Sequence, residues 1–312
     1  MEVKLGDLIE NKYRIVRLLG EGGMGAVYEG ENTRIHHRVA IKVLHPNIAT
    51  NTAVVERFER EAQAAGKIGS DHIVAVYDLG DLGDGGRYMV MEYLDGENLA
   101  ARIHASGRIA PAFLAPMLLQ LLDGLGAAHS AGIVHRDLKP ENIFLVRHKS
   151  GQDFVKIVDF GVSKFNSVQG AAEMSMTRTG SVLGTPYYMS PEQAKGAKAT
   201  DLRSDLYSVG VVLFECATGQ VPFQADTFNE LMFKIALEEA PDPAAVVPGL
   251  DPGFAAIVRK AMARDPAQRF QTATDFQDAI LDWMKQNGLS TSFVSKNYSS
   301  SRLGSAATEP PG

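Results

Sequence analysis

The chain has 312 residues, 45% of them hydrophobic, and a formal net charge of −6 at pH 7. This length and apolar content are enough for one large domain or two lobes around a sizeable core. The acidic balance gives no reason to expect nucleic acid as a partner, and a single cysteine, Cys216, excludes an internal disulfide and favours a reducing, cytoplasmic location.

Segments that would place the chain in a membrane are not evident. The apolar run at 209–217 contains Glu215, and it is shorter than the ~20 residues that a membrane helix needs. The N-terminus alternates charge and lacks the apolar core of a signal peptide. The eight histidines show no ligand spacing, so no metal-binding histidine site is expected. We therefore expect a chain with no membrane segment.

The predicted elements divide into two lobes. After a lead-in at 1–12, residues 13–43 are rich in β-branched residues and glycine, which predicts short strands. A helix follows at 52–68, because apolar residues recur at 3- and 4-residue steps, and two more strands are predicted at 73–80 and 87–94. This predicts a small, mainly β lobe over 13–94, ending near the sequence DGEN at 95–98.

The second predicted lobe covers 95–287 and is mainly helical. A long helix is predicted at 111–132, then two strand-like pieces around a hairpin at 147–152, and four helices from residue 201 onward, separated by proline-rich loops. The serine-rich residues 288–312 contain few bulky apolar side chains, which predicts a disordered tail. The expected class is α+β.

A glycine-rich stretch, LGEGGMGAVYEG, carries Gly20, Gly22 and Gly25 in a G-x-G-x-x-G array. Alone it could be a flexible hairpin turn or a dinucleotide-binding fingerprint. The residues after it are β-like, whereas the dinucleotide motif opens a helix, and no Gly-Lys-Ser/Thr follows as in a P-loop. We interpret it as a strand-joining turn whose backbone N–H groups can approach phosphate oxygens.

Lys42 lies inside the apolar strand RVAIKVL. An isolated strand lysine usually points to solvent, but Lys42 shares a strand face with Ala40. If Ala40 packs against a ligand, Lys42 is enclosed with it and needs an acidic partner. The candidate is Glu61 in the helix at 52–68, with Glu56 and Glu59 as rivals.

The stretch GIVHRDLKPENIFL has apolar ends and a polar middle. Asp137 can orient a hydroxyl group and accept its proton, and Lys139 can neutralise a moving phosphoryl group. Asn142 and Asp159, the latter in KIVDFG, offer oxygen ligands of the kind that Mg²⁺ prefers. The full array, HRDLKPEN with VDFG and then SPE downstream, is far more specific than any of its parts.

These motifs, in this order, resemble the catalytic domain of Ser/Thr protein kinases over about residues 13–283. LGEGGMGAVYEG and GTPYYMSPEQ most resemble bacterial members of the eukaryotic-type family, although SPE at 190–192 replaces the commoner APE. The resemblance implies a bilobal protein-kinase fold and an ATP-dependent Ser/Thr protein kinase with a signalling role. It also implies ATP and Mg²⁺ (or Mn²⁺) as cofactors, protein substrates, and a kinase-domain dimer that could serve trans-autophosphorylation.

The resemblance also implies roles for single residues. Lys42 would hold the α- and β-phosphates and pair with Glu61, Asp137 would be the catalytic base, and Lys139 would steady the γ-phosphate. Asn142 and Asp159 would hold the metal. Val27, Ala40 and Phe144 would enclose adenine, Met91 would line the back of the pocket, and the backbone of Glu92 and Leu94 would read the adenine edge. The implied nucleotide-binding set is Leu19, Gly20, Glu21, Gly22, Gly23, Met24, Gly25, Ala26, Val27, Ala40, Lys42, Met91, Glu92, Leu94 and Phe144.

Other matched positions imply structural and regulatory roles. Asp205 would brace the catalytic loop, Glu192 would pair with Arg269, and Thr185 matches Ser/Thr rather than Tyr specificity. Arg136, directly before Asp137, is typical of relatives that are activated by phosphate on the activation loop. Thr177 and Thr179 are the expected phosphosites, whereas Ser175 and Ser181 are interpreted as ordinary loop hydroxyls.

Two alternatives remain at this point. A pseudokinase or scaffold would bind nucleotide or partners without transfer, and a kinase of the same fold could act on a small molecule. The pattern also leaves open whether the chain is part of a longer membrane-anchored receptor kinase.

Overall fold

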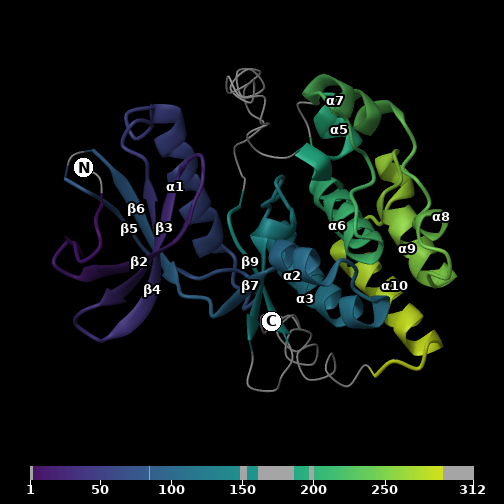
Figure 1. The fold of residues 1–312 in the computed structure, drawn as a ribbon, viewed down its shortest axis with the longest axis horizontal. Helices are drawn as coiled ribbons and strands as arrows, with labels where there is room; N and C mark the ends of the chain where they lie inside the picture. The colour runs from purple at the N-terminus through teal and green to yellow at the C-terminus, as the bar shows by residue number, and fades with distance from the viewer. Residues whose placement is uncertain (1–2, 84, 148–152, 161–185, 197–199, 291–312) are drawn as a thin grey trace, which may run out of the picture.

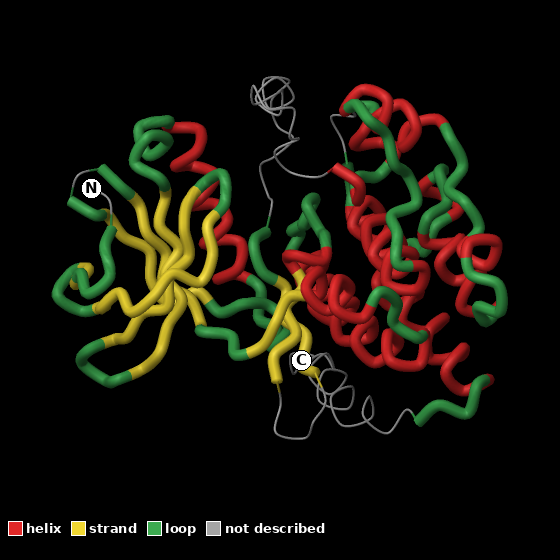
Figure 2. The backbone as a smooth tube through the Cα atoms, viewed as in Figure 1, coloured by secondary structure: helices red, strands yellow, loops and turns green. Residues whose placement is uncertain are grey.

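The computed structural model describes residues 3–83, 85–147, 153–160, 186–196 and 200–290. Within them a β-rich lobe and a helical lobe lie side by side, joined by a short stretch of chain (Figures 1 and 2). In the sequence this stretch lies between Glu92 and Gly96. The elements of the first lobe are β1 (Leu8–Ile9), β2 (Tyr13–Glu21), β3 (Gly25–Asn32), β4 (His37–Leu44), α1 (Thr52–Lys67), β5 (Val76–Asp81) and β6 (Arg87–Glu92).

The first-lobe strands form one antiparallel sheet in the order β1-β2-β3-β4-β6-β5. Successive side chains of β4 point to opposite faces, as the pleat of a strand requires. Val39, Ile41 and Val43 join an apolar cluster on one face, while Ala40 and Leu44 join a second cluster with Phe58 and Ala62 of α1. Lys42 therefore shares the face of Ala40 that α1 covers.

The second lobe contains a small sheet and the remaining helices. Its sheet has the order β7-β8-β9 and is antiparallel. Its strands and helices are β7 (Gly96–Asn98), α2 (Leu99–Ser106), α3 (Pro111–Ser130), β8 (Ile143–Arg147), β9 (Asp153–Ile157), α5 (Pro191–Ala194), α6 (Leu202–Thr218), α7 (Phe228–Leu237), α8 (Pro243–Val246), α9 (Pro252–Ala261) and α10 (Ala273–Gln286), with 3₁₀ turns η1 (Pro140–Asn142), η2 (Pro186–Tyr188) and η3 (Pro266–Gln268).

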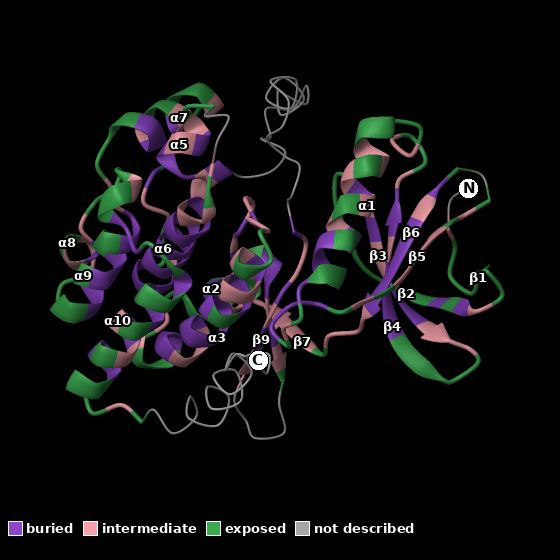
Figure 3. Ribbon diagram, turned by 180° about the vertical axis from the view of Figure 1, so that it is seen from behind, coloured by how far each residue is buried: buried purple, intermediate pink, exposed green. Residues whose placement is uncertain are grey.

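The largest core of the described residues lies in this second lobe. It is built mainly from α3, α6, α9 and α10, whose facing sides are buried (Figure 3). α6 is buried almost all round, because α3, α9 and the segment at η2 enclose it. A core of this size provides the rigid base on which the loop after α3 is held.

Helix α3 bears on the expectation that the chain has no membrane segment. It has 20 residues and is, among the described helices, the one whose length and apolar composition would suit a membrane span. Its apolar side chains are instead buried against α10, α6 and β9, which accounts for its composition.

Several boundaries differ from the expected ones. The segment at 95–98 contains strand β7, which pairs with β8, and α2 was not predicted. Asn98 caps α2 by accepting a hydrogen bond from Ala101 N, a start signal that the sequence carries. β1, within the expected lead-in at 1–12, pairs with β2 and buries Ile9.

Candidate active site

Lys42 forms the centre of a three-residue cluster. Its Nζ lies 2.7 Å from Glu61 Oε1 and 2.8 Å from Asp159 Oδ1. Each residue comes from a different element: β4, α1 and the loop directly after β9. The two rival glutamates have other partners, since Glu56 pairs with Arg60 and Glu59 with Arg87. The ion pair expected between Lys42 and Glu61 is therefore present.

The electrostatics of this cluster follow from burial and charge. Burial favours neutral Lys42, but the charges of Asp159 and Glu61 outweigh it and raise the pKa of Lys42. Burial would also raise the pKa of Asp159, but the positive charge of Lys42 lowers it to about 2. Asp159 is thus ionised at neutral pH, and 45% of its side-chain surface remains exposed.

The loop that carries Asp137 is fixed by a buried carboxylate. Asp205, in the first turn of α6, accepts hydrogen bonds of 2.8 Å from the backbone N–H groups of both His135 and Arg136, and a third from His129 Nε2. Arg136 has a φ of +65°, a left-handed conformation that is costly for a residue with a side chain. The two backbone hydrogen bonds to Asp205 stabilise that conformation, which is the bracing role expected for Asp205.

His135 connects this loop to the Asp159 segment. Asp137 N–H donates to its Nδ1 at 3.3 Å, and its Nε2 lies 3.3 Å from Val158 O. Burial lowers the pKa of His135, in agreement with a neutral ring that accepts at Nδ1 and donates at Nε2. Its ring also packs on Phe160, with the ring centroids 4.8 Å apart.

Asn142 and Lys139 lie beside Asp137. Asn142 Nδ2 donates to the backbone carbonyl of Asp137 at 2.9 Å, and Asn142 O accepts from Val158 N at 2.9 Å. Lys139 Nζ lies 3.9 Å from Asp137 Oδ2. The hydrogen bonds through Val158 hold η1, the Asp137 loop and Asp159 together. The structure thus links the predicted base, both predicted metal ligands and the two predicted lysines through contacts of Asp159, Val158 and Asn142.

The glycine turn joins β2 to β3, as its sequence context indicated. Gly22 and Gly25 exchange backbone hydrogen bonds of 2.9 and 3.3 Å, which close the turn. A Cβ atom on Gly25 would lie 2.0 Å from the carbonyl oxygen of Val43, whereas one on Gly20 would meet nothing within 4 Å. Packing against β4 therefore requires the glycine at 25, and packing does not explain the one at 20.

Four of the remaining predicted nucleotide residues, Met24, Val27, Ala40 and Met91, lie on the α1-facing side of the sheet. Ala40 is paired with Met91 across β4 and β6, Val27 is paired with Lys42 across β3 and β4, and Met24 and Val27 pack against the same apolar cluster. Ala26 is buried opposite Val43. The exposed residues are Leu19, Gly20, Glu21, Gly22 and Gly23, and the half-buried ones are Glu92, Leu94 and Phe144.

Two contacting residues, His45 and Lys156, were not singled out from the sequence, and the side chain of Glu92 has contacts that its expected backbone role did not predict. His45 Nε2 lies 3.0 Å from Gly22 O and so contacts the glycine turn. Glu92 uses its side chain to accept hydrogen bonds from Ala75 N (2.8 Å) and from Lys156 Nζ (2.6 Å). Lys156 lies in β9, and Glu92 is 64 positions away in the chain. A lysine in a strand gives no sequence signal for an ion pair with so distant a residue, so this pair could not be predicted.

Glu192 and Arg269 form a buried pair rather than a surface one. Arg269 donates to both carboxylate oxygens of Glu192, at 2.8 and 2.9 Å, and its own side chain is 0% exposed. Burial by itself would raise the pKa of Glu192, but the hydrogen bonds from Arg269 and Ser204 lower it to about 2. The pair expected from the resemblance is therefore present.

The serine of SPE has a structural use. Ser190 caps α5 by accepting from Gln193 N, and Gln193 Oε1 accepts from Ser190 N, which forms a capping box. Gln193 Nε2 also donates to Arg136 O at 2.9 Å, which ties α5 to the loop that carries Asp137. Serine at this position thus replaces the alanine of the commoner motif with a helix cap.

Thr177, Thr179 and Thr185 lie outside the described residues. Arg136, the residue expected to meet an activation-loop phosphate, has a buried Nε atom with no hydrogen-bond partner among the residues that the structure describes. The same holds for Nε of Arg57 in α1, which the sequence interpretation did not single out.

Comparisons with known proteins agree with this geometry. The protein kinase domain family model matches residues 13–281. The chain is 40% identical over 268 residues to the Ser/Thr-protein kinase Pkn1 of Myxococcus xanthus, covering 86% of this chain and 38% of that protein. It is 38% identical over 271 residues to PknD of Mycobacterium tuberculosis, covering 86% of this chain and 39% of PknD. It thus spans well under half the length of these curated relatives.

Among solved structures, the kinase domain of Mycobacterium tuberculosis PknI superposes with a TM-score of 0.69 at 25% identity, covering 90% of this chain and 99% of that domain. The β-rich first lobe, the helical second lobe and the order of the motifs match this family. The chain therefore belongs to the protein kinase domain family and has the bilobal protein-kinase fold.

Proposed function

We propose that this chain is the catalytic domain of an ATP-dependent Ser/Thr protein kinase with a signalling role in the cytoplasm. The observation that carries the proposal is the cluster in which Lys42 contacts Glu61 and Asp159 while the Asp137 loop is linked to the same segment through Val158. In this family, the lysine–glutamate pair and the metal-binding aspartate must both be in place for transfer.

The residues of the site have distinct roles in the proposed reaction. Lys42, held by Glu61, binds the α- and β-phosphates of ATP. Asp137 orients the hydroxyl of a substrate serine or threonine and accepts its proton as the new O–P bond forms and the bond to the ADP leaving group breaks. Lys139 neutralises charge on the transferred phosphoryl group. Catalysis then rests on positioning and charge neutralisation.

The proposed metal ligands fit Mg²⁺ (or Mn²⁺) by their chemistry. Asn142 uses Nδ2 to donate to Asp137 O, so its Oδ1 is the side-chain atom left to bind a cation. Asp159 is ionised and partly exposed. One amide oxygen and one carboxylate are typical of a site that Mg²⁺ shares with substrate phosphates. When bound, the ion supplies charge neutralisation to the phosphates.

The adenine site is proposed from the register of the first-lobe sheet. Val27 and Ala40 lie on the α1-facing side of the sheet with Met91 at the back, and Phe144 of β8 is proposed to enclose the ring from the second lobe. The backbone of Glu92, at the end of β6, and of Leu94, just after it, is proposed to hydrogen-bond the adenine edge.

The decisive test is phosphate transfer from radiolabelled ATP to a generic protein substrate, followed by identification of the labelled amino acid. We expect label on serine or threonine, and Asp137→Asn should lower the rate by roughly 10²–10⁴-fold, the usual contribution of a general base. ATP binding should be nearly unchanged. Asp123→Asn, an exposed carboxylate of α3, is the matched control.

Other outcomes of this assay would contradict the proposal. Nucleotide binding without any transfer would indicate the alternative, a pseudokinase or scaffold. Transfer to small molecules but not to protein would indicate a different substrate class, and undiminished transfer by Asp137→Asn would contradict the assignment of the base.

We also propose activation by phosphorylation of Thr177 and Thr179, with Arg136 binding the phosphate. The buried Nε of Arg136 supports this, because a buried donor without a partner among the described residues is costly until an acceptor arrives. Protein substrates and a kinase-domain dimer for trans-autophosphorylation belong to this proposal, and a trans reaction would accelerate with protein concentration.

Phosphopeptide mapping of active enzyme tests this regulation. We expect phosphate on Thr177 or Thr179, and the double variant Thr177→Ala, Thr179→Ala should lose most activity while Ser175→Ala, Ser181→Ala keeps it. Full activity of the threonine double variant, with neither threonine phosphorylated in the wild type, would overturn the assignment.

A further inference from the structure

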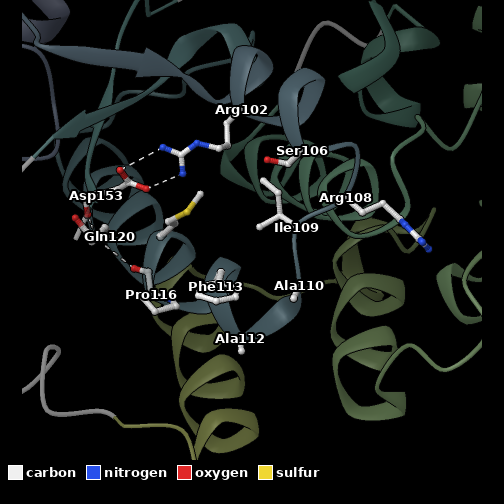
Figure 4. Close-up of a pocket in the computed structure, with 11 residues that line it drawn as sticks. Arg102, Ser106, Arg108, Ile109, Ala110, Ala112, Phe113, Pro116, Gln120 and Asp153 are labelled. Carbon is white, nitrogen blue, oxygen red and sulfur yellow. Dashed lines mark hydrogen bonds and ion pairs between the residues drawn. The ribbon is translucent and has the colours of Figure 1, made fainter. Parts of the chain in front are cut away.

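A groove on the second lobe involves none of the residues of the proposed active site. It has a volume of about 650 Å³ and lies between the end of α2, the loop at 107–110, the first half of α3 and the start of β9 (Figure 4). Ile109 and Met117 line it and also pack against the core. Phe113 lines it too, yet 73% of its surface is exposed. An aromatic side chain this open beside a groove is suited to contact another apolar group.

The charged groups at one end of the groove are already paired. Arg102 donates to Asp153 at 2.9 Å, as Figure 4 shows, and to Glu97 at 2.6 Å. Gln120 donates to Asp153 O and accepts from Val155 N, which fixes the wall to β9. Because these charges satisfy one another, this end of the groove favours an apolar occupant over a strongly charged one, and Arg108 is the other charged residue of the lining.

The path of α10 leads toward this groove. The position of Gly126 in α3 faces Ala273 at the start of α10, and Gln277, one turn later, donates to the carbonyl of Leu119. Later residues of α10 contact earlier residues of α3, so the two helices run antiparallel. The end of α10 therefore lies near the start of α3, where Ala112 and Phe113 line the groove.

The chain leaves α10 at this same end. Gly288 has a φ of +66°, and Leu289 N–H donates to Met284 O, which is the hydrogen bond of a Schellman helix end. Leu289 packs against the core, and the described chain stops at Ser290. The 22 residues that follow contain four large apolar side chains, Phe293, Val294, Tyr298 and Leu303. The first of them is three residues on, a reach of up to about 10 Å.

We propose that residues 291–312 bind in this groove of their own lobe, with their large apolar side chains against Ile109, Phe113 and Met117. The segment is tethered beside the groove, so its local concentration is far above that of any free peptide. Binding would cover the exposed Phe113. The groove is then an intramolecular docking site, and an external partner can use it only by displacing the tail.

The test measures how accessible a thiol in the groove is in the full chain. Cys216, the one native cysteine, is buried, so Ala112→Cys introduces a single reactive thiol at the groove. Gln63→Cys, on an exposed position of α1, serves as a distant reference. Each is combined with one of two tail variants. In the first, Phe293, Val294, Tyr298 and Leu303 become serine. In the second, Ser295, Ser299, Ser300 and Ser301 become alanine.

We expect a polar maleimide to react with the groove thiol about tenfold faster in the first tail variant than in the native-tail chain, as for a groove occupied about nine-tenths of the time. The second tail variant should keep the slow rate, and the α1 thiol should react alike in all chains. Phe113→Ser should also accelerate the groove thiol, with no further gain when combined with the first tail variant. Phe113 is exposed, so folding is not at risk.

Two results would overturn the proposal. Equal rates with the native tail and with the first tail variant would show that the tail does not cover the groove. Protection that disappears when the protein is diluted would assign the groove to a second copy of the chain instead.

Discussion

Two residues of the proposed site adopt backbone conformations that are costly for a residue with a side chain, and ionic groups from other elements support them. Arg136 (φ +65°) and Asp159 (φ +56°) are non-glycine residues in the left-handed region. Arg136 directly precedes the proposed base Asp137, and Asp159 is a proposed metal ligand. Each such residue costs on the order of 1–3 kcal/mol. Asp205 offsets this cost at Arg136 through two backbone hydrogen bonds, and Lys42 holds the side chain of Asp159. The strain is therefore supported by buried ionic groups from other elements.

The Glu192–Arg269 pair predicts a pH dependence of stability. The pKa of Glu192 is about 2 in the folded chain against an ordinary value of 4.5. Folding thus favours the ionised form, so this stabilisation is complete above about pH 5 and is lost as the pH falls through the range from 4.5 to 2. The difference corresponds to on the order of 3 kcal/mol.

Urea unfolding of Glu192→Gln checks this prediction. The variant should be less stable than the wild type by on the order of 3 kcal/mol at pH 7, because Arg269 stays buried without its charge partner, and the gap should narrow toward pH 3. Glu239→Gln, whose side chain is 75% exposed and 3.4 Å from Arg264, is the control and should change little. A gap that is independent of pH would contradict the assignment.

At the scale of elements, the two ends of the glycine turn serve different needs. Gly25 lies against the backbone of β4, whereas Gly20 faces open space. Sequence spacing treats these positions as equivalent, but their surroundings differ. One glycine is required for strand packing, and the other is free to serve a ligand.

Alanine at each position separates the two roles. Gly25→Ala should destabilise the chain by ~1–3 kcal/mol, because the new Cβ would overlap Val43 O and push β3 from β4. Gly20→Ala should change stability by no more than about 0.5 kcal/mol but raise KM for ATP several-fold. Urea unfolding and initial rates measure both, with Gly69→Ala, another glycine in open space, as control. Equal loss of stability in both variants would contradict this division.

At the scale of the whole molecule, the proposed site depends on how the lobes are joined. Val74 N donates to Ile157 O and Ile157 N donates to His72 O, so the segment after α1 pairs with β9. The ring of His72 also stacks on Phe154, with centroids 4.6 Å apart. The helix that carries Glu61 and the strand that precedes Asp159 are thus connected directly. The pairing of residues 72–74 with β9 fixes the distance between Glu61 and Asp159, which allows Lys42 to contact both.

Ligand-induced stabilisation tests the assembled site. A non-hydrolysable ATP analogue at about 100 times its Kd should stabilise the wild type by roughly 2.7 kcal/mol, and Mg²⁺ should raise Tm further. Asp159→Asn should keep the rise due to nucleotide and lose the additional rise due to Mg²⁺. Asp278→Asn, an exposed carboxylate of α10, should behave as the wild type. An unchanged Mg²⁺ effect in Asp159→Asn would exclude it as a ligand.

Much of this protein follows from sequence alone, because its signals are local. Runs of β-branched residues punctuated by glycine predicted the first-lobe strands, apolar periodicity predicted α1, α3 and the helices after residue 201, and the motif order identified the family. The two polar motifs around Asp137 and Asp159 also named most of the residues that the structure brings together. Short elements such as α2 and β7 were not predicted, because so few residues cannot show a clear helical or strand periodicity.

Only the tertiary structure decided which of these residues meet. Glu61 and Asp205 were expected in their roles, but the contacts they make with Lys42 and with the backbone of Arg136 join residues far apart in the chain. The pairing of Glu92 with Lys156, also far apart in the chain, was not expected at all. The need for glycine at 25 but not at 20 likewise depends on a neighbouring strand. Sequence patterns report the conformation of adjacent residues, whereas burial, ion pairing and pKa depend on distances that exist only once the lobes have packed.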